Sequence, residues 1–193
     1  MPINNENTFY PSSREEWRQW LEENHINEES VWLVQYKVKS NKKSISWSES
    51  VDEALCFGWI DSVKRTIDDE SYKQYYSKRK PNSTWSKINK DKVALFTEQG
   101  LMAEAGLLTI EVAKKNGSWT ILDEVEELIV PTDLEEAFDK EVNSKDYYLS
   151  LSKSTQKMLL AWIVLAKRPE TRQKRIDEIA TQAAKQKLPK HIG

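Results

Sequence analysis

The sequence predicts an α+β protein: a small antiparallel sheet with a β-hairpin packed by helices, followed by an all-helical C-terminal region. Three observations predict this class. Residues 31–38 are rich in β-branched and aromatic side chains, which favour a strand. Residues 59–79 hold two runs of alternating character around a polar tetrapeptide, as in a hairpin. Beyond residue 132 the apolar residues recur at helical spacing.

Capping residues place the first helices. Ser13 and Ser46 are each followed three residues later by Glu, which is the capping-box pattern of a helix start. They predict helices over about 14–23 and 48–57, on either side of the strand 31–38. The helices and the strand are amphipathic and short, so we expect them to pack on one another around the aromatic residues.

In the hairpin, strict alternation directs Trp59, Asp61, Val63 and Arg65 to one face and Lys64 to the other. The runs are WIDSVKRTI and YKQYYSKRK, and DDES joins them. Because proline cannot donate to a ladder, the proline after the second run is expected to end it.

The helix after the hairpin is expected to begin at Ser83 or Thr84, since both residue types cap helices well. It should end at Gln99, with Gly100 in the left-handed position that closes many helices. A further helix is expected over about 104–115.

Charge is unevenly spread, although 29 Lys and Arg against 31 Asp and Glu give a net charge of only −2. Residues 62–92 carry nine basic against four acidic side chains, and residues 167–190 carry eight against three. Residues 123–141 carry nine acidic side chains against one lysine. A net charge so close to zero offers no general case for nucleic-acid or membrane binding. The local charge runs most often mark solvated faces.

The acidic stretch suggests a division of the chain. We expect an α+β N-terminal region over 1–118, an acidic connector over 119–131 and a helical C-terminal region over 132–193. The last region carries apolar stripes too large to leave exposed together, so we expect it to pack on the first.

The single cysteine, Cys56, excludes an internal disulfide and fits a reducing compartment. The first residues lack the basic and apolar segments of a signal peptide, and no apolar run approaches the roughly 20 residues that span a bilayer. We therefore expect a cytoplasmic protein without a membrane span.

Metal and nucleotide chemistry have little basis in the sequence. The two histidines, His25 and His191, lie far apart, and one cysteine cannot complete a zinc set. No glycine-rich phosphate-binding motif is present. We expect no metal and no cofactor, and we expect Cys56 to be a buried, unreactive thiol.

The richest segment for function is 53–89, where the hairpin lies between two helices. A helix N-terminus beside basic side chains favours anions, and aromatic side chains could wall a pocket there. The alternative is purely structural: buried tryptophans, a capping serine, and a carboxylate paired with a nearby arginine. The candidate ligand-binding residues are Trp59, Asp61, Arg79, Lys80, Ser83, Trp85 and Asn89.

The runs EALCFGWIDSVKR, YYSKRKPNSTWSKINKDKVALF and QGLMAEAGLLTIEVAKKNGSW resemble the YdeI/OmpD-associated, or bacteriocin-protection, family. The C-terminal run YYLSLSKSTQKMLLAWIVLAKRPETRQKRIDEIATQAAKQK is similar to its helical C-terminal region, so the resemblance covers nearly the whole chain. Ser62 stands where the family commonly has Gly, and Lys80 where it commonly has Arg. The resemblance implies protection against bacteriocins or antimicrobial peptides, with no settled enzymatic activity.

Three functions follow from these observations. The first is a protection module that binds a small anionic or zwitterionic ligand or a peptide. The second is an enzyme of unknown reaction with Asp61 as general base or Cys56 as nucleophile. The third is a nucleic-acid accessory protein that uses the basic faces 62–92 and 167–190, with tryptophan and tyrosine for stacking. We favour the first, and expect no catalysis; neither the ligand nor the oligomeric state follows from the sequence.

Overall fold

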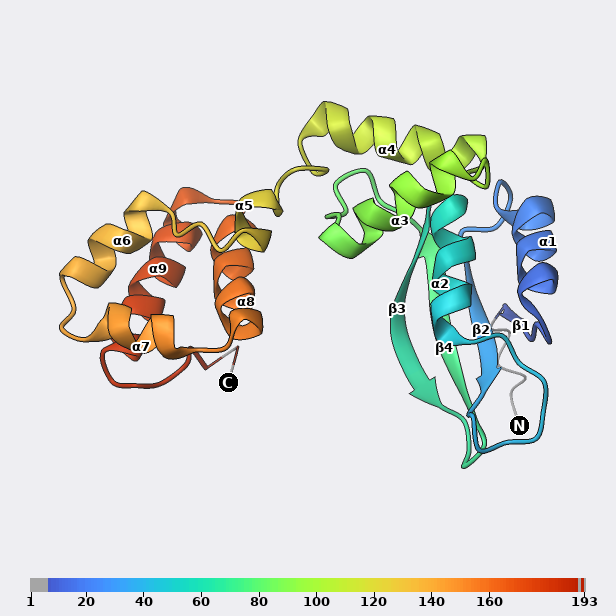
Figure 1. The fold of residues 1–193 in the computed structure, drawn as a ribbon, viewed down its shortest axis with the longest axis horizontal. Helices are drawn as coiled ribbons and strands as arrows, with labels where there is room; N and C mark the ends of the chain where they lie inside the picture. The colour runs from blue at the N-terminus through green and yellow to red at the C-terminus, as the bar shows by residue number, and fades with distance from the viewer. Residues whose placement is uncertain (1–6, 191, 193) are drawn as a thin grey trace. The chain divides into compact units, whose positions relative to one another are not determined.

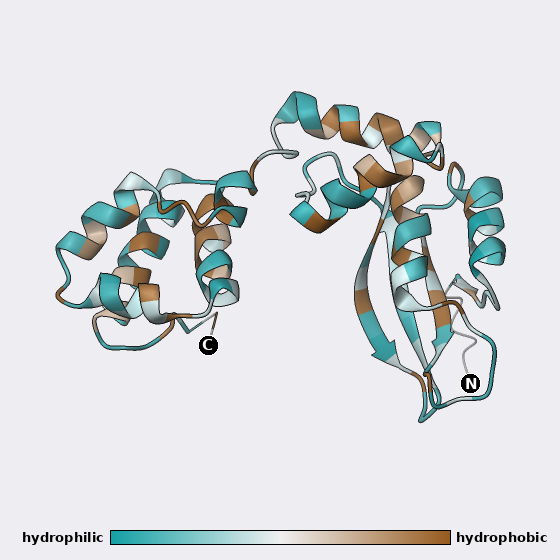
Figure 2. Ribbon diagram, viewed as in Figure 1, coloured by the Kyte–Doolittle hydropathy of each residue, from teal (hydrophilic) through white to brown (hydrophobic). Residues whose placement is uncertain are grey.

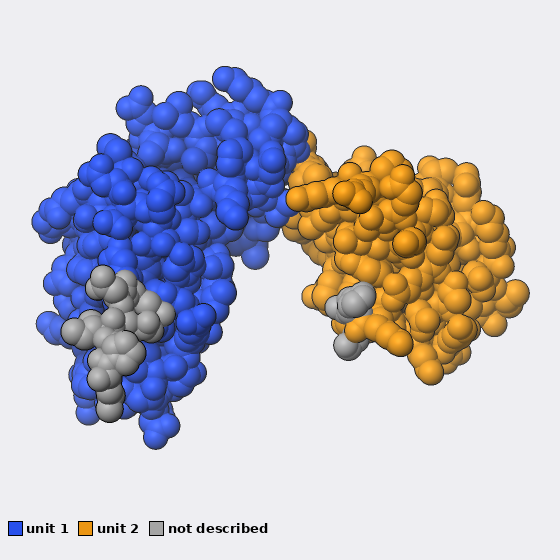
Figure 3. Space-filling view, turned by 180° about the vertical axis from the view of Figure 1, so that it is seen from behind, with its two compact units in different colours: residues 1–119 blue, residues 120–193 orange. Residues whose placement is uncertain are grey.

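The computed structural model describes residues 7–190 and 192, and the chain forms two compact units (Figures 1 and 3). Unit 1 comprises Met1–Trp119 and unit 2 comprises Thr120–Gly193. Each unit has a hydrophobic core of its own. The acidic stretch expected to be a connector contributes a short helix and the buried side chain of Val125 to the core of unit 2.

A four-stranded sheet forms the centre of unit 1, in the order β1-β2-β4-β3. The predicted strand and hairpin are confirmed as antiparallel neighbours. The short β1, which pairs in parallel with β2, was not predicted and makes the sheet mixed. Two residues are too few to show a periodicity, so β1 left no signal in the sequence. The strands are β1 (Thr8–Phe9), β2 (Ser30–Tyr36), β3 (Trp59–Thr66) and β4 (Ser71–Lys78).

A β-bulge in β3 overturns the expected alternation. Asp61 pairs with Tyr76 while Lys64 pairs with Gln74, so two residues of β3 oppose a single residue of β4. Lys64 therefore shares the face of Asp61, and Arg65 turns to the opposite face. There the Arg65 guanidinium carbon lies 4.8 Å from the ring centroid of Trp32.

Within the described residues of unit 1, four helices accompany the sheet: α1 (Arg14–Asn24), α2 (Trp47–Cys56), α3 (Lys87–Glu98) and α4 (Glu104–Asn116). Both predicted capping serines, Ser13 and Ser46, accept hydrogen bonds from the first turns of α1 and α2. The ribbon shows α2 lying over the sheet and running along the strands, and α3 and α4 lie at one end of the sheet (Figure 1). The core of the unit includes the fully buried Trp17, Leu33 and Tyr76.

The start of α3 differs from the prediction by two to three residues. Ser86 is the N-cap, and its hydroxyl accepts a hydrogen bond from the backbone N–H of Asn89 at 3.3 Å. The segment offers Ser83, Thr84 and Ser86 as possible caps. Trp85 is buried in the core just before the helix, and this packing selects the last of the three. The predicted C-terminal end at Gln99, with Gly100 at a φ of +69°, is confirmed.

Two glycines bring α4 directly onto the junction between α2 and β3. A Cβ atom at Gly106 would lie 2.2 Å from the carbonyl oxygen of Cys56, and one at Gly58 would lie 2.7 Å from a methyl carbon of Thr109. The backbone N–H of Ala103 donates to the same Cys56 oxygen at 3.0 Å. This close approach sets the distance between α4 and the end of the hairpin.

Every regular element of unit 2 is a helix, as predicted for the C-terminal region. The core includes Leu134, Phe138, Leu160, Ile163 and Ile176, all buried. The helices are α5 (Asp123–Glu126), α6 (Thr132–Asp139), α7 (Ser144–Ser150), α8 (Lys153–Val164) and α9 (Pro169–Ala183).

Candidate functional site

Arg79 and Trp85, two of the candidate residues, lie in direct contact. Arg79 follows β4, where its backbone N–H donates to the carbonyl of Gly58 at 2.9 Å. Its guanidinium carbon lies 3.8 Å from the ring centroid of Trp85, a cation–π contact. Its Nη1 donates to the backbone carbonyl of Thr84 at 2.9 Å. The arginine is therefore held in one orientation by the segment between the hairpin and α3.

Two of the three nitrogens of this guanidinium have no acceptor within the described residues. The Arg79 residue is only 7% exposed, and its Nε and Nη2 are buried without a hydrogen-bond partner. Desolvation lowers the pKa of Arg79 to about 10, and the charge of Asp61 opposes this shift in part. A buried charge with unpaired N–H groups is costly to a folded protein, so this arrangement calls for an explanation beyond packing.

A cavity of about 150 Å³ adjoins this arginine. One side is formed by Arg79, Lys80, Pro81 and Trp85, and α4 forms the other side. The walls are mostly apolar, and Lys80 is exposed at the rim. The α4 residues that line it are Leu108, Thr109 and Val112.

Asp61 does not line the cavity. It lies on the helix-covered face of the sheet, where its Oδ2 accepts hydrogen bonds from the indole of Trp47 at 3.1 Å and the amide of Gln74 at 3.2 Å. Of the arginines near it in the sequence, Arg65 lies on the opposite face of the sheet because of the bulge. Asp61 acts on Arg79 only through its charge.

The other candidate residues also lie outside the cavity lining. Trp59 is buried against Trp20, with ring centroids 5.8 Å apart, and its indole nitrogen has no partner among the described residues. Ser83 lies in a turn in which its N–H donates to the carbonyl of Lys80 at 2.9 Å. Asn89 belongs to the first turn of α3. Because α3 begins at Lys87, Ser83 is not its N-cap, and the prediction of a helix start there was wrong.

Two comparisons with known families bear on the chain. Residues 9–109, more than half of it, match a family model described as "Domain of unknown function (DUF8412)". The chain belongs to this family. Residues 127–186 match a model described as "Bacteriocin-protection, YdeI or OmpD-Associated". The resemblance seen in the sequence is thus supported for the C-terminal helices, while its N-terminal part is matched by DUF8412. Searches of curated proteins and of solved structures found no significant match.

The DUF8412 region also contains Cys56, the candidate nucleophile. Its side chain is fully buried. Burial raises the pKa of the Cys56 thiol to about 11; Glu53 adds to this shift, and Arg18 opposes it. A thiol with such a pKa is almost entirely protonated at neutral pH, which argues against nucleophilic catalysis.

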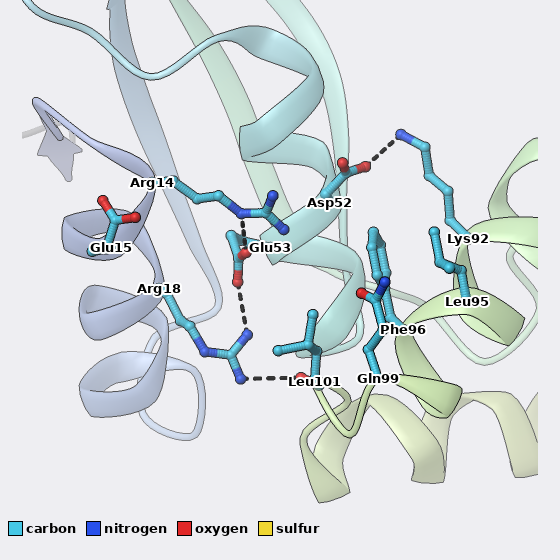
Figure 4. A pocket seen from close by; sticks show the side chains of 10 residues that line it. All are labelled: Arg14, Glu15, Arg18, Asp52, Glu53, Lys92, Leu95, Phe96, Gln99 and Leu101. Carbon is cyan, nitrogen blue, oxygen red and sulfur yellow. Dashed lines mark hydrogen bonds and ion pairs between the residues drawn. The ribbon is translucent and has the colours of Figure 1, made fainter.

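A second cavity in the DUF8412 region, of about 500 Å³, lies among α1, α2 and α3 (Figure 4). Glu53, only 2% exposed, pairs there with both Arg14 and Arg18, and Asp52 pairs with Lys92. Sequence reasoning missed these residues because α1 and α2 are separated by the strand β2. The one signal was the i, i+4 spacing of the two arginines on α1.

Two general observations concern the described residues. No group of three or more His, Cys, Asp or Glu is arranged to hold a metal ion within residues 7–190 and 192; His191, named above, lies outside this part. Over the same residues, no helix is both long and apolar enough to cross a bilayer.

Proposed function

We propose that this protein is of the bacteriocin-protection type and that unit 1 binds a small anionic ligand in the Arg79 cavity. The match of residues 127–186 supports the protection role. The observation that carries the binding role is the buried guanidinium with two unpaired nitrogens beside a cavity. An anion would supply both the missing acceptors and the missing counter-charge.

Binding is better supported than catalysis. The hydroxyl of Thr109, which lines the cavity, already donates to the carbonyl of Gly106 at 2.7 Å. Asp61 is engaged by two donors on another face, and the thiol of Cys56 is buried. None of the three is placed to move a proton or attack a bound molecule in this cavity.

The nucleic-acid interpretation has less support, because the basic stretch 62–92 does not form one face. Lys64 lies over Tyr72 with its Nζ 3.9 Å from the ring centroid, while Arg65 lies over Trp32 on the opposite side of the sheet. The other basic stretch, 167–190, belongs to unit 2.

The test is a thermal-shift screen of the full-length protein with acetate, benzoate, phosphate and sulfate at constant ionic strength. A ligand that binds only the folded state raises the melting temperature. We expect at least one anion to stabilise the wild type and the Lys80→Met variant, which removes the exposed cation at the rim, but not Arg79→Met. The proposal fails if no anion stabilises the wild type, or if Arg79→Met responds equally.

A further inference from the structure

We propose that the ligand of the Arg79 cavity is an apolar monocarboxylate of about the size of benzoate. This inference rests on the proposed function and specifies the class of anion. Four properties of the cavity lead to it: the edge of the guanidinium that is unpaired, the contacts made by other parts of the group, the apolar walls and the volume.

The two unpaired nitrogens, Nε and Nη2, lie on the same edge of the Arg79 guanidinium. Their N–H bonds form a fork that matches the two oxygens of a carboxylate. The protein uses this edge elsewhere in that way. In unit 2, Nε and Nη2 of Arg172 donate to the two carboxylate oxygens of Asp133 at 2.7 and 2.9 Å. The unpaired edge of Arg79 therefore has the geometry that a carboxylate fills.

Two other parts of the Arg79 guanidinium are engaged. The Trp85 ring stacks on one face, 3.8 Å from the guanidinium carbon, and Nη1 donates to the carbonyl of Thr84. The hydrogen bonds left for an anion are those of Nε and Nη2. A carboxylate is planar and carries one charge, which one guanidinium neutralises. A phosphate group carries about two charges and would hold its remaining oxygens against apolar walls.

The walls favour an apolar body behind the carboxylate. Pro81, Leu108 and Val112 offer no hydrogen bonds from their side chains, and the hydroxyl of Thr109 is already used within α4. A cavity of about 150 Å³ is large enough for a benzene ring. Apolar residues run along much of α4 (Figure 2), so a slightly longer body would continue onto an apolar surface.

Access to the fork requires a movement, because Nε and Nη2 are closed to water as well as unpaired. Leu108 and Val112 are 53% and 42% exposed, so either side chain can turn outward without breaking into the core. Binding that waits for such a movement is slower than simple diffusional encounter. A carboxylate that reaches the fork would give Nε and Nη2 two charge-assisted hydrogen bonds.

Calorimetric titration of the full-length protein at pH 8 tests the class of ligand, with benzoate, acetate, benzamide and phenyl phosphate as probes. We expect benzoate to bind at least about tenfold more tightly than the other three, which corresponds to about 1.4 kcal/mol. Arg79→Lys keeps the charge but removes the fork, and it should weaken benzoate by at least about tenfold. Lys92→Met, in the other cavity, is the control and should bind as the wild type does. The Nε–H signal of Arg79 in an NMR spectrum should shift on binding.

The outcomes separate the two proposals. If phenyl phosphate binds more tightly than benzoate, and its binding depends on Arg79, the inference of a monocarboxylate is wrong while the proposed function stands. If the neutral benzamide binds more tightly than benzoate, the cavity does not select an anion, and both proposals fail. If benzoate binds equally to Arg79→Lys, or if acetate binds as well as benzoate, the fork or the apolar walls do not select the ligand, and the inference fails. If no probe and no anion of the thermal-shift screen binds in an Arg79-dependent way, both proposals fail.

Discussion

Arg79 in unit 1 and Arg172 in unit 2 present the same guanidinium edge to very different surroundings. The Arg172 side chain is 32% exposed, and both nitrogens of the edge hold Asp133. Arg79 is far more buried, and the same two nitrogens hold nothing within the described residues. Stability alone favours the reverse, because an unpaired charge costs most where it is most buried. The proposed anion in the Arg79 cavity would account for this difference.

Unit 1 is able to pair its other buried charges. Glu53, the most buried carboxylate in the large cavity, is shared by Arg14 and Arg18. The unpaired edge of Arg79 is therefore a local property of the end of the hairpin, and not a general feature of the unit. Four predictions, beginning with the largest effect, test the packing of unit 1 around the cavity and then the two arginines themselves.

The first prediction concerns the packing that builds the cavity. Gly106→Ala should lower the free energy of unfolding by about 3 kcal/mol, because the added Cβ would meet the backbone of Cys56, which cannot easily move aside. Hydrogen exchange should become faster in unit 1 and stay unchanged in unit 2. Gly100→Ala is the control: it has open space but a φ of +69°, so only a backbone cost of about 1 kcal/mol is expected. Equal effects of the two substitutions would show that α4 can shift away from the junction.

The second prediction uses alkaline pH. The folded protein holds the Cys56 proton up to a pKa of about 11, whereas in the unfolded chain the thiol ionises near its ordinary value of 9.0. The unfolded state therefore binds fewer protons between these pH values, and the contribution of Cys56 to stability, complete below pH 9, falls by about 2 kcal/mol as pH rises to 11. Denaturant titrations of the wild type and Cys56→Ala at several pH values measure the difference. If the difference in free energy of unfolding between the wild type and Cys56→Ala stays constant from pH 8 to 11, the thiol is not held protonated by burial.

The third prediction inverts the usual effect of a core substitution. Arg79→Met should raise the free energy of unfolding without ligand by about 1 kcal/mol, since it removes two buried, unpaired N–H groups at the cost of one hydrogen bond and a cation–π contact. Above pH 10 the folded wild type releases the Arg79 proton while its unfolded chain keeps it, so the wild type becomes more stable as pH rises. The stability advantage of Arg79→Met over the wild type should therefore shrink. A less stable Arg79→Met variant would instead make Arg79 a structural residue.

The fourth prediction is the counterpart in unit 2. Arg172→Met should lower the free energy of unfolding by up to about 1 kcal/mol, because it breaks a partly exposed, bidentate ion pair with Asp133. The effect should weaken at high salt, where exposed charges are screened. If both Met variants changed the free energy of unfolding in the same direction by the same amount, the two arginines would not differ in their effect on stability as we infer.

Local signals predicted most of the elements. The capping serines Ser13 and Ser46 lie at the starts of α1 and α2, and Gly100 follows the end of α3, because these features depend on neighbours within four residues. The features that failed depend on distant contacts. The bulge at Asp61 and the start of α3 after Trp85 are decided by what packs against them.

Part of the candidate site could also be predicted. The pair Arg79 and Trp85 was found because both flank the end of the hairpin, and the structure brings them to 3.8 Å. The α4 wall was missed, since Leu108, Thr109 and Val112 looked like an ordinary amphipathic helix. Asp61 is a candidate because its strand neighbours the one that leads to Arg79, but the neighbourhood of two strands does not decide which partners a side chain meets.

The sequence by itself determined the α+β class, the hairpin, the helical C-terminal region and the short list of residues that contains Arg79, because periodicity and capping are local properties of the chain. Only the tertiary structure decided that the edge of Arg79 remains unpaired and that α4 closes a cavity beside it. The physical reason is that a hydrogen bond left unmade, like a cavity, is a property of the whole packed unit. It depends on where residues such as Gly106 and Asp61, distant in the chain, come to rest.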